Sequence, residues 1–340
     1  MPPAIQGGGR LVDERKIESI SIIIVNWNSG YLLDECFRHL SRQTIHPEHI
    51  YVMDNDSTDE SCNLKNIPDF VKVIKLPANI GFAAGNNRAL SECKSDFVAL
   101  LNPDAFPASD WIEQMLKAAQ RHPNTVAFGS RQLCYEDANL IDGIGDSYHI
   151  SGLVWRGRHG LKQKPEDLIE REIFSPCAAA AMYRREAIEE VGGFDEDFFC
   201  YVEDVDLGFR LRLAGYKAIY VPDAVVQHVG SATTGGQHSD FAVYHGHRNI
   251  VWTYFKNMPG ILFWLFLPLH ISLNILTIIV FAFRRQFRVI LQSKRDAVKG
   301  IAKVWRKRRK IQTKRNATCQ TISIALNKQL ISGKKKSRRR

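Results

Sequence analysis

Apolar and polar positions are organised in alternating blocks along the first hundred residues. Helix-sized segments with an apolar stripe occupy residues 31–40 and 110–121, and Ser109 precedes the second as a candidate cap. Short runs rich in β-branched residues predict four strands, at residues 19–25, 50–53, 71–76 and 97–101. Strands separated by helices are typical of βαβ units. We therefore predict an α/β fold with a mainly parallel, covered sheet.

Polar side chains follow each of the four predicted strands. In strand order they are Asn26, then Asp54 with Asn55, then Asn79, then Asn102 with Asp104. Because the carboxyl ends of parallel strands meet at one edge of a sheet, these groups would line a single ligand-binding crevice. Any one of them could equally stabilise a turn, so the prediction depends on the whole set.

The type of ligand is limited by the motifs that the sequence does not contain. It has neither the GxxxxGK[ST] pattern of a P-loop nor the GxGxxG pattern of a dinucleotide-binding turn. A crevice rich in carboxylate and amide oxygens suits instead a ligand whose phosphates arrive with Mg²⁺ or Mn²⁺.

A second acidic group lies later in the chain, directly before an apolar, helix-like run. Glu203, Asp204 and Asp206 fall within four positions, and Gly215 follows the run as a candidate C-cap. One interpretation is a plain acidic helix start, in which Asp206 accepts hydrogen bonds from free N–H groups. Two cations within two helical turns could pair with these acids: Arg210 and Arg212.

Charge is distributed unevenly along the 340 residues. The net charge is +10, but residues 284–340 carry 21 Lys and Arg against one acidic residue, so the remaining body is acidic. The seven cysteines form no CxxC pair, which favours a reducing compartment. Residues 1–16 are rich in Gly and Pro and lack an apolar core, so we expect a flexible N-terminus and no secretory signal.

One segment is apolar enough to contact a membrane. Residues 261–283 contain no formal charge over 23 positions, and about 20 suffice to cross a bilayer. Pro268, His270 and Asn274 interrupt the stretch. The alternative is a buried core helix, but so long a segment that is apolar on every face favours membrane contact.

Six blocks of sequence together resemble the signature blocks of family-2 glycosyltransferases. In order they are SIIIVNWNSGYLLDECFRHLSRQT, VMDNDSTDES, LPANIGFAAGNNRAL, LLNPDA, GGFDEDFFCYVEDVDLGFRLRLAGY and QHVGSATTG, between about residues 20 and 257. The chain is most similar to bacterial rhamnosyltransferase-type enzymes that build surface polysaccharides. The resemblance implies a GT-A fold over residues 17–257, with a nucleotide-sugar half (17–130) and an acceptor half (131–257). It also implies inverting transfer from a nucleoside-diphosphate sugar.

The resemblance further implies roles on the donor side. Asp104 matches the metal-binding member of a D-x-D motif whose first position is here Asn102, and His228 matches a metal ligand of some relatives. A histidine after an apolar strand could equally be a satisfied structural group. The cofactor would be Mn²⁺ or Mg²⁺. The donor-binding residues would be Asn26, Asp54, Asn55, Asn79, Gly81, Gly85, Asn86 and Asn102.

On the acceptor side, Asp204 matches the catalytic base of the family's ED motif. One carboxylate would remove the proton from the attacking hydroxyl, while the cation neutralises the departing diphosphate. Glu203 and Asp195 would shape the acceptor site.

The C-terminal part should place this domain at a membrane. The donor sugars are cytoplasmic, and the basic tail also belongs on that side, so a single crossing would separate the two. We expect residues 258–292 to re-enter or lie in the membrane plane, bent near Pro268, and residues 293–340 to form a basic amphipathic, flexible tail on anionic lipids. The enzyme would act on the cytoplasmic face of the inner or plasma membrane, on a glycan or lipid-linked acceptor.

The alternative is a catalytically inactive GT-A-like domain that binds membranes or nucleic acid through its tail. The acidic body and the adjacent apolar segment argue against nucleic acid as the partner.

Overall fold

The computed structural model describes residues 18–62, 70–230, 236 and 238–329. The predicted flexible N-terminus (1–16) lies outside these residues. So do residues 231–235 of the QHVGSATTG block and the last eleven residues of the basic tail.

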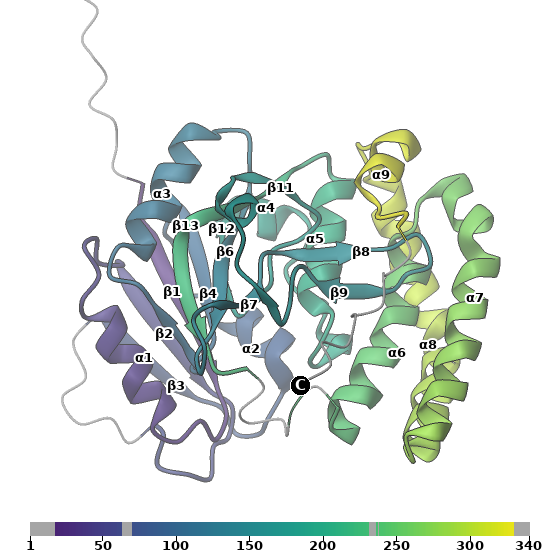
Figure 1. Cartoon of the computed structure of the whole chain (residues 1–340), viewed down its shortest axis with the longest axis horizontal. Helices are drawn as coiled ribbons and strands as arrows, with labels where there is room; N and C mark the ends of the chain where they lie inside the picture. The colour runs from purple at the N-terminus through teal and green to yellow at the C-terminus, as the bar shows by residue number, and fades with distance from the viewer. Residues whose placement is uncertain (1–17, 63–69, 231–235, 237, 330–340) are drawn as a thin grey trace, which may run out of the picture.

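A mixed, mostly parallel central sheet forms the core of the fold (Figure 1). Its strand order is β10-β7-β6-β12-β4-β1-β2-β3, and β3, β2, β1 and β4 run parallel to one another. These four strands confirm the sequence prediction: β1 is Ile20–Asn26, β2 is His49–Asp54, β3 is Val71–Lys75 and β4 is Phe97–Leu101.

The second half of the sheet is largely antiparallel. Strand β12 pairs antiparallel with both β4 and β6, while β13 runs parallel to β6 and antiparallel to β5. A separate hairpin, β8–β9, extends from the sheet toward the C-terminal helices (Figure 1). The bounds are β5 Ala105–Pro107, β6 Ala127–Cys134, β7 Leu140–Gly143, β8 Asp146–Tyr148, β9 Val154–Arg156, β10 Leu161–Lys162, β11 Arg171–Ile173, β12 Ala180–Arg184 and β13 Ala218–His228.

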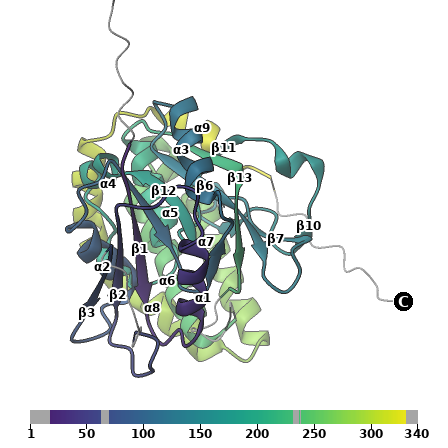
Figure 2. The same ribbon diagram turned by 90° about the vertical axis from the view of Figure 1, so that its left-hand side faces the viewer.

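Helices cover both faces of the sheet because each central strand is apolar on both sides. In β1, Ile22 and Ile24 point into the core beneath α1 and α3, whereas Ile23 and Val25 face α2, α4 and α5. Figure 2 shows α1 in front of the strands and α6 and α8 behind them. The bounds are α1 Leu32–Leu40, α2 Gly81–Leu90, α3 Trp111–Arg121, α4 Arg185–Glu190 and α5 Glu203–Leu213.

The start of α3 differs from its prediction. Ser109 does not cap the helix, since Asp110 occupies the N-cap position and makes no capping bond with its side chain. Instead, the side chain of Gln43, from another segment, caps the helix: its Oε1 accepts from the Ile112 N–H at 3.1 Å. A cap supplied from a distant segment leaves no local signal in the sequence.

Three long helices follow the sheet domain and pack together at one end of the molecule (Figure 1). They are α6 Asp240–Asn257, α7 Gly260–Phe283 and α8 Phe287–Thr313, with a short α9 at Cys319–Ala325. Within the part predicted to form a basic amphipathic, flexible tail (293–340), residues 293–313 belong to α8. Helix α8 packs along α6, where Gly300 leaves room for the Trp252 ring and the Trp252 Nε1–H donates to the Ala297 carbonyl at 2.9 Å.

Buried ion pairs join this helical part to the sheet domain. Lys256 of α6 is almost fully buried and contacts Asp206 of α5 at 2.8 Å as well as Asp195. Asp206 also accepts from Arg210 at 2.8 Å, so it pairs with cations and does not cap α5 as predicted. Lys307 of α8 pairs with Asp195 too. Gly215, at φ +100°, does terminate α5 as expected.

Replacing Lys256 by Met should destabilise the protein by about 3–5 kcal/mol, because Asp206 and Asp195 would keep buried charge without their shared partner. The free energy of unfolding is measured by urea denaturation followed by circular dichroism. The matched control is Lys303→Met, because Lys303 is 58% exposed beside Asp197 and should cost about 0–1 kcal/mol. Equal losses in the two variants would contradict the account.

Candidate active site

The ends of β1, β2 and β4 lie at one level of the sheet. The register pairs Asn26 with Asp54, and Ile23 with Leu100, so the three strands end within about two residues of one another. Adjacent strands lie about 4.8 Å apart, which places the ends of β2 and β4 about 10 Å from each other. The polar strand ends predicted from the sequence thus share one edge.

The side chains at the ends of β1 and β2 are buried in loop hydrogen bonds. Asn26 Nδ2 donates to Ser61 Oγ at 2.9 Å. Asp54 Oδ1 accepts from the Ser57 N–H at 3.1 Å. Asn55 Oδ1 accepts from the Ile80 N–H at 2.9 Å. These groups shape the loops along the edge.

Other predicted donor residues make similar local bonds. Asn79 Oδ1 accepts from the Gly81 N–H at 3.0 Å, and Asn86 Nδ2 donates to the Phe82 carbonyl at 2.8 Å. Asn102 is joined to the neighbouring strand through its backbone N–H, which donates to the Ala179 carbonyl at 2.9 Å.

At the two predicted donor glycines, neighbouring side chains occupy the space that a Cβ would need. A Cβ on Gly81, which has φ +86°, would lie 2.6 Å from the Phe199 ring. A Cβ on Gly85 would lie 3.0 Å from Val25 of β1. Both glycines therefore allow close packing of α2 against its neighbours, and their contact with the nucleotide stays a prediction.

His228, the last residue of β13, lies between two carboxylates. Strand β13 pairs it with Ala105, which brings it beside Asp104. His228 Nε2 is 3.3 Å from Asp104 Oδ1, and Nδ1 is 2.8 Å from Asp142 Oδ2. Burial lowers the pKa of His228, but the two carboxylates raise it more strongly, to about 9. His228 Nε2 makes no hydrogen bond to a described residue.

Asp142 extends this pair into a chain of charges. It contacts Arg156 Nη1 at 2.5 Å and His159 Nδ1 at 3.3 Å. Burial alone would raise the pKa of Asp142, but His159, His228 and Arg156 hold it well below its usual range. Gly143 makes this possible, because a Cβ there would lie 2.5 Å from Arg156 Cδ.

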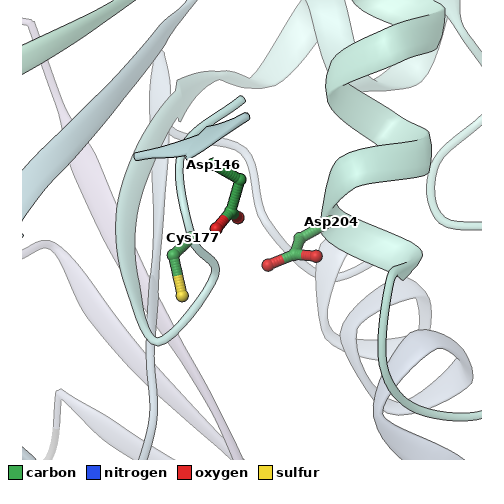
Figure 3. Close-up of side chains that lie close together, drawn as sticks. All are labelled: Asp146, Cys177 and Asp204. Carbon is green, nitrogen blue, oxygen red and sulfur yellow. The ribbon is translucent and has the colours of Figure 1, made fainter. Parts of the chain in front are cut away.

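Beyond Arg156 lies a third group, formed by Asp146, Cys177 and Asp204 (Figure 3). Their ligand atoms all lie within 4.8 Å of one another. Asp204 Oδ2 accepts from the Ala178 N–H at 3.0 Å, and Oδ1 accepts from the Val205 N–H at 2.8 Å. Burial nevertheless raises the pKa of Asp204, and it raises the pKa of Asp146 and Cys177 as well.

The two predicted acceptor residues differ in their surroundings. Glu203 is buried beside Asp204, and its Oε2 makes no hydrogen bond to a described residue. Burial, and then the Asp204 charge, raises the pKa of Glu203 well above its usual range. Asp195 instead pairs with Lys256 and Lys307, so the structure does not bring it into this cluster.

The sequence analysis missed the residues that connect the two predicted ends of the site. Asp142, Asp146, Arg156 and His159 all lie in or beside short strands of three or four residues. Such strands carry too few positions for a periodic signal.

The arrangement can perform two chemical tasks at two ends of one charged chain. At one end Asp104 and His228 present an oxygen and a nitrogen side by side, as ligands of a divalent cation do. At the other end Asp204 offers a carboxylate of raised basicity near the cation Arg156. Asp142 and Arg156 fix the relative position of the two.

Models of two glycosyltransferase families match the chain. The model of glycosyl transferase family 2 matches residues 21–192, which is half of the chain. The model of glycosyl transferase family group 2 matches residues 153–286.

Curated relatives include rhamnosyltransferases. The N-acetylglucosaminyl-diphospho-decaprenol L-rhamnosyltransferase of Mycobacterium tuberculosis is 29% identical over 239 residues, covering 64% of this chain and 78% of that protein. The O-antigen chain rhamnosyltransferase WbaN of Salmonella anatum is 28% identical over 235 residues, covering 67% of this chain and 72% of that protein.

Solved structures share the fold. The mannosyltransferase PcManGT of Pyrobaculum calidifontis, in complex with GDP-Man and Mn²⁺, superposes with a TM-score of 0.53 at 16% identity, covering 91% of this chain and 87% of that one. GalNAc-T7 with UDP, GalNAc and Mn²⁺ has a TM-score of 0.58 at 15% identity, covering 72% of this chain and 48% of that one. At these identities the likeness establishes a GT-A fold. The sequence match and this fold together show that the chain belongs to glycosyl transferase family 2.

Proposed function

We propose that the protein is an inverting glycosyltransferase that moves a sugar from a nucleoside-diphosphate donor to a lipid-linked or glycan acceptor. The observation that carries the proposal is the charged chain from Asp104 through His228, Asp142 and Arg156 to Asp204. It holds a candidate cation site and a candidate base at a fixed separation within one site. Rhamnose is the proposed sugar, because two similar proteins are named as rhamnosyltransferases.

Asp204 is the proposed base. Its backbone hydrogen bonds from Ala178 and Val205 hold the carboxylate in place, and burial raises its pKa, which strengthens it as a proton acceptor. It would take the proton from the acceptor hydroxyl as that oxygen forms its bond to the anomeric carbon and the bond to the diphosphate breaks. Attack from the face opposite the leaving group inverts the configuration. Glu203, buried beside it, would help to shape the acceptor side.

Asp104 and His228 are the proposed metal ligands. Their oxygen and nitrogen atoms lie 3.3 Å apart, and His228 Nε2 makes no hydrogen bond to a described residue, so the pair fits a cation such as Mn²⁺ or Mg²⁺. When bound, the cation would supply charge neutralisation for the diphosphate leaving group. Asp142 holds the imidazole through Nδ1 so that Nε2 faces Asp104.

The edge formed by β1, β2 and β4 is the proposed donor site. Asp54 pairs with Asn26 in the register of β1 and β2, and it lies two strand spacings, about 10 Å, across the sheet from the end of β4. A nucleoside and its phosphates can bridge this distance. Asn55, Asn79, Asn86 and Asn102 would keep the surrounding loops in shape through the bonds described above.

We further propose that the enzyme works at the cytoplasmic face of the inner or plasma membrane. Helix α7 is one candidate membrane-associated helix by length and composition. The similar M. tuberculosis protein is named for an acceptor linked to decaprenol, which agrees with an acceptor held in a membrane. Anionic lipids are the proposed partners of the basic C-terminal part.

The first test is a panel of nucleoside-diphosphate sugars with Mn²⁺ or Mg²⁺, in which release of nucleoside diphosphate is measured. Asp204→Asn should lower acceptor-dependent release by at least about 100-fold, because the general base is removed, while donor affinity stays within about twofold. The control is Asp223→Asn, at an exposed position of β13. Full turnover by Asp204→Asn would refute its role, and no turnover of any donor by the parent protein would refute the proposed activity.

A second test concerns the residue behind the histidine. Asp142→Asn should weaken Mn²⁺ binding about 10–100-fold, as loss of an outer-shell carboxylate usually does. Calorimetric titration of Mn²⁺ in the presence of nucleoside diphosphate measures the affinity without turnover. Glu136→Gln, at an exposed position between β6 and β7, is the control. Unchanged Mn²⁺ affinity in Asp142→Asn would exclude His228 as a ligand that Asp142 orients.

The pH dependence follows from the raised pKa of Asp204. A base acts only when ionised, so kcat should fall as the pH drops through the pKa in the folded protein. Because burial raises that pKa, the fall should begin at a higher pH than for an ordinary aspartate, whose pKa is 3.8. A pH–rate profile with saturating donor and acceptor measures this limb. A profile that stays flat down to the ordinary aspartate range would contradict the assignment.

A further inference from the structure

Helix α7 has an apolar face that no described part of the chain covers. At 100° per residue its exposed apolar side chains fall on one half of the helix. The exposed fractions range from 37% at Val280 to 86% at Phe283. We call this the outward face of α7, and it consists of Ile261, Trp264, Leu265, Leu269, Ile271, Ile275, Leu276, Ile279, Val280 and Phe283.

The opposite face of α7 is partly polar and is fixed to the rest of the protein. His270 Nδ1 lies 2.7 Å from the Ser151 carbonyl oxygen, and the His270 ring stacks on Tyr254 at 4.0 Å. Asn274 Oδ1 accepts from Lys294 of α8 at 2.6 Å. Since buried polar groups are costly without partners, these contacts fix which side of α7 faces the protein.

Both ends of α7 are held against α6. Near the start, the Tyr254 hydroxyl donates to the Phe263 carbonyl at 2.7 Å. Near the end, Phe281 packs on the His247 ring at 4.7 Å. Helix α7 is continuous through Pro268, so it does not turn back on itself as a re-entrant segment would.

These contacts with α6 and α8 argue against a membrane crossing by α7. If α7 spanned a bilayer, α6 and α8 would have to enter the bilayer beside it. Helix α8 carries ten Lys and Arg between Arg288 and Lys310, and charges at the bilayer centre are strongly unfavourable. The outward face can meet lipid only if α7 lies along the membrane surface.

Helix α8 adds a basic border to the outward face. Leu291 and Val298 are 41% and 64% exposed. They lie three and four residues from Lys294, which contacts Asn274 of α7, so they stand on the side of α8 next to α7. Arg288, Arg295 and Arg306 are exposed at spacings of 7 and 11 residues, which places them on one side of α8. An apolar face next to a cationic stripe matches the boundary between acyl chains and anionic headgroups.

We propose that α7 lies in the plane of an anionic phospholipid bilayer, with its outward face in the headgroup–acyl boundary and the arginine stripe of α8 on the headgroups. The enzyme is then monotopic and no segment between residues 238 and 329 crosses the membrane. This proposal rests on the membrane location proposed above and specifies its geometry.

The same geometry connects the membrane to the active site. The turn between β8 and β9 sits on α7, where Gly152 leaves room for His270: a Cβ would lie 2.7 Å from Nδ1. The hairpin, seen in Figure 1, carries Asp146, which lies beside Asp204 (Figure 3), and Arg156, whose charge acts on Asp204. A lipid-linked acceptor would therefore approach Asp204 along the β8–β9 side.

The test measures the depth of two positions on the outward face. Vesicles containing phosphatidylglycerol and lipids brominated at different acyl positions quench tryptophan according to its depth. Trp264 of the full-length protein is compared with a Trp264→Phe, Ile271→Trp variant, and Trp264→Phe alone supplies the background from the other tryptophans. The two positions are seven residues apart, or about 10 Å along the helix axis.

An in-plane helix predicts equal, shallow depths for both positions. A difference of about 10 Å, with position 271 near the bilayer centre, would show a crossing helix and overturn the proposal. Absence of quenching together with absence of co-sedimentation with the vesicles would overturn the membrane location as well. Release of nucleoside diphosphate, assayed separately, shows whether glycosyl transfer stands in either case.

The contribution of the arginine stripe is tested by Arg288→Gln, Arg295→Gln and Arg306→Gln together. Affinity for vesicles containing phosphatidylglycerol should fall about fivefold per charge, with little change on phosphatidylcholine alone. The control is Arg38→Gln, Arg42→Gln and Lys117→Gln together, exposed positions in or near α1 and α3 on the other side of the molecule (Figure 2). Equal losses in both sets would contradict a specific basic stripe.

Discussion

The buried histidine at the end of β13 is the contact on which the site depends. His228 lies between Asp104, which follows β4, and Asp142 of β7, so it joins the parallel half of the sheet to the largely antiparallel half. Asp142 in turn forms an ion pair with Arg156, whose charge lies near Asp204. Asp104, His228 and Asp142 are buried and Arg156 is half-buried, each beside a partner of opposite charge, so removing any one of them alone is costly. The separation between the proposed cation site and the proposed base is therefore set by the fold.

A second buried group of charges makes the sheet domain and the long helices one unit. Lys256 of α6 reaches Asp206 of α5, only two residues from Asp204, and Asp195 receives both Lys256 and Lys307. The helix that carries the proposed base is thus braced by the helices that carry the outward face of α7. With α7 in the proposed membrane plane, the distance from the membrane surface to Asp204 would be fixed by packed structure. A flexible linker would leave that distance variable.

Much of the fold could be predicted from the sequence, because the four central strands have strong local patterns and the polar strand ends follow from topology. The contacts between distant segments could not. The Gln43 cap of α3 and the pairing of Asp206 with Lys256 depend on residues 69 and 50 positions away. Asp204 and His228 were found by resemblance, whereas Asp142 and Arg156 lie in strands too short to give a pattern. The glycines of the α2 loop matched a family motif, yet their packing against Phe199 and Val25 is visible only in three dimensions.

The central claim is that the cation and the base occupy opposite ends of the charged chain. Diffraction from crystals grown with Mn²⁺ and a nucleoside diphosphate, recorded for the anomalous signal of manganese, locates the ion directly. The account predicts one peak between the Asp104 carboxylate and His228 Nε2, at about 2.0–2.3 Å from each. A peak among Asp146, Cys177 and Asp204 would contradict it, because the ion would then occupy the carboxylate that has to accept the proton.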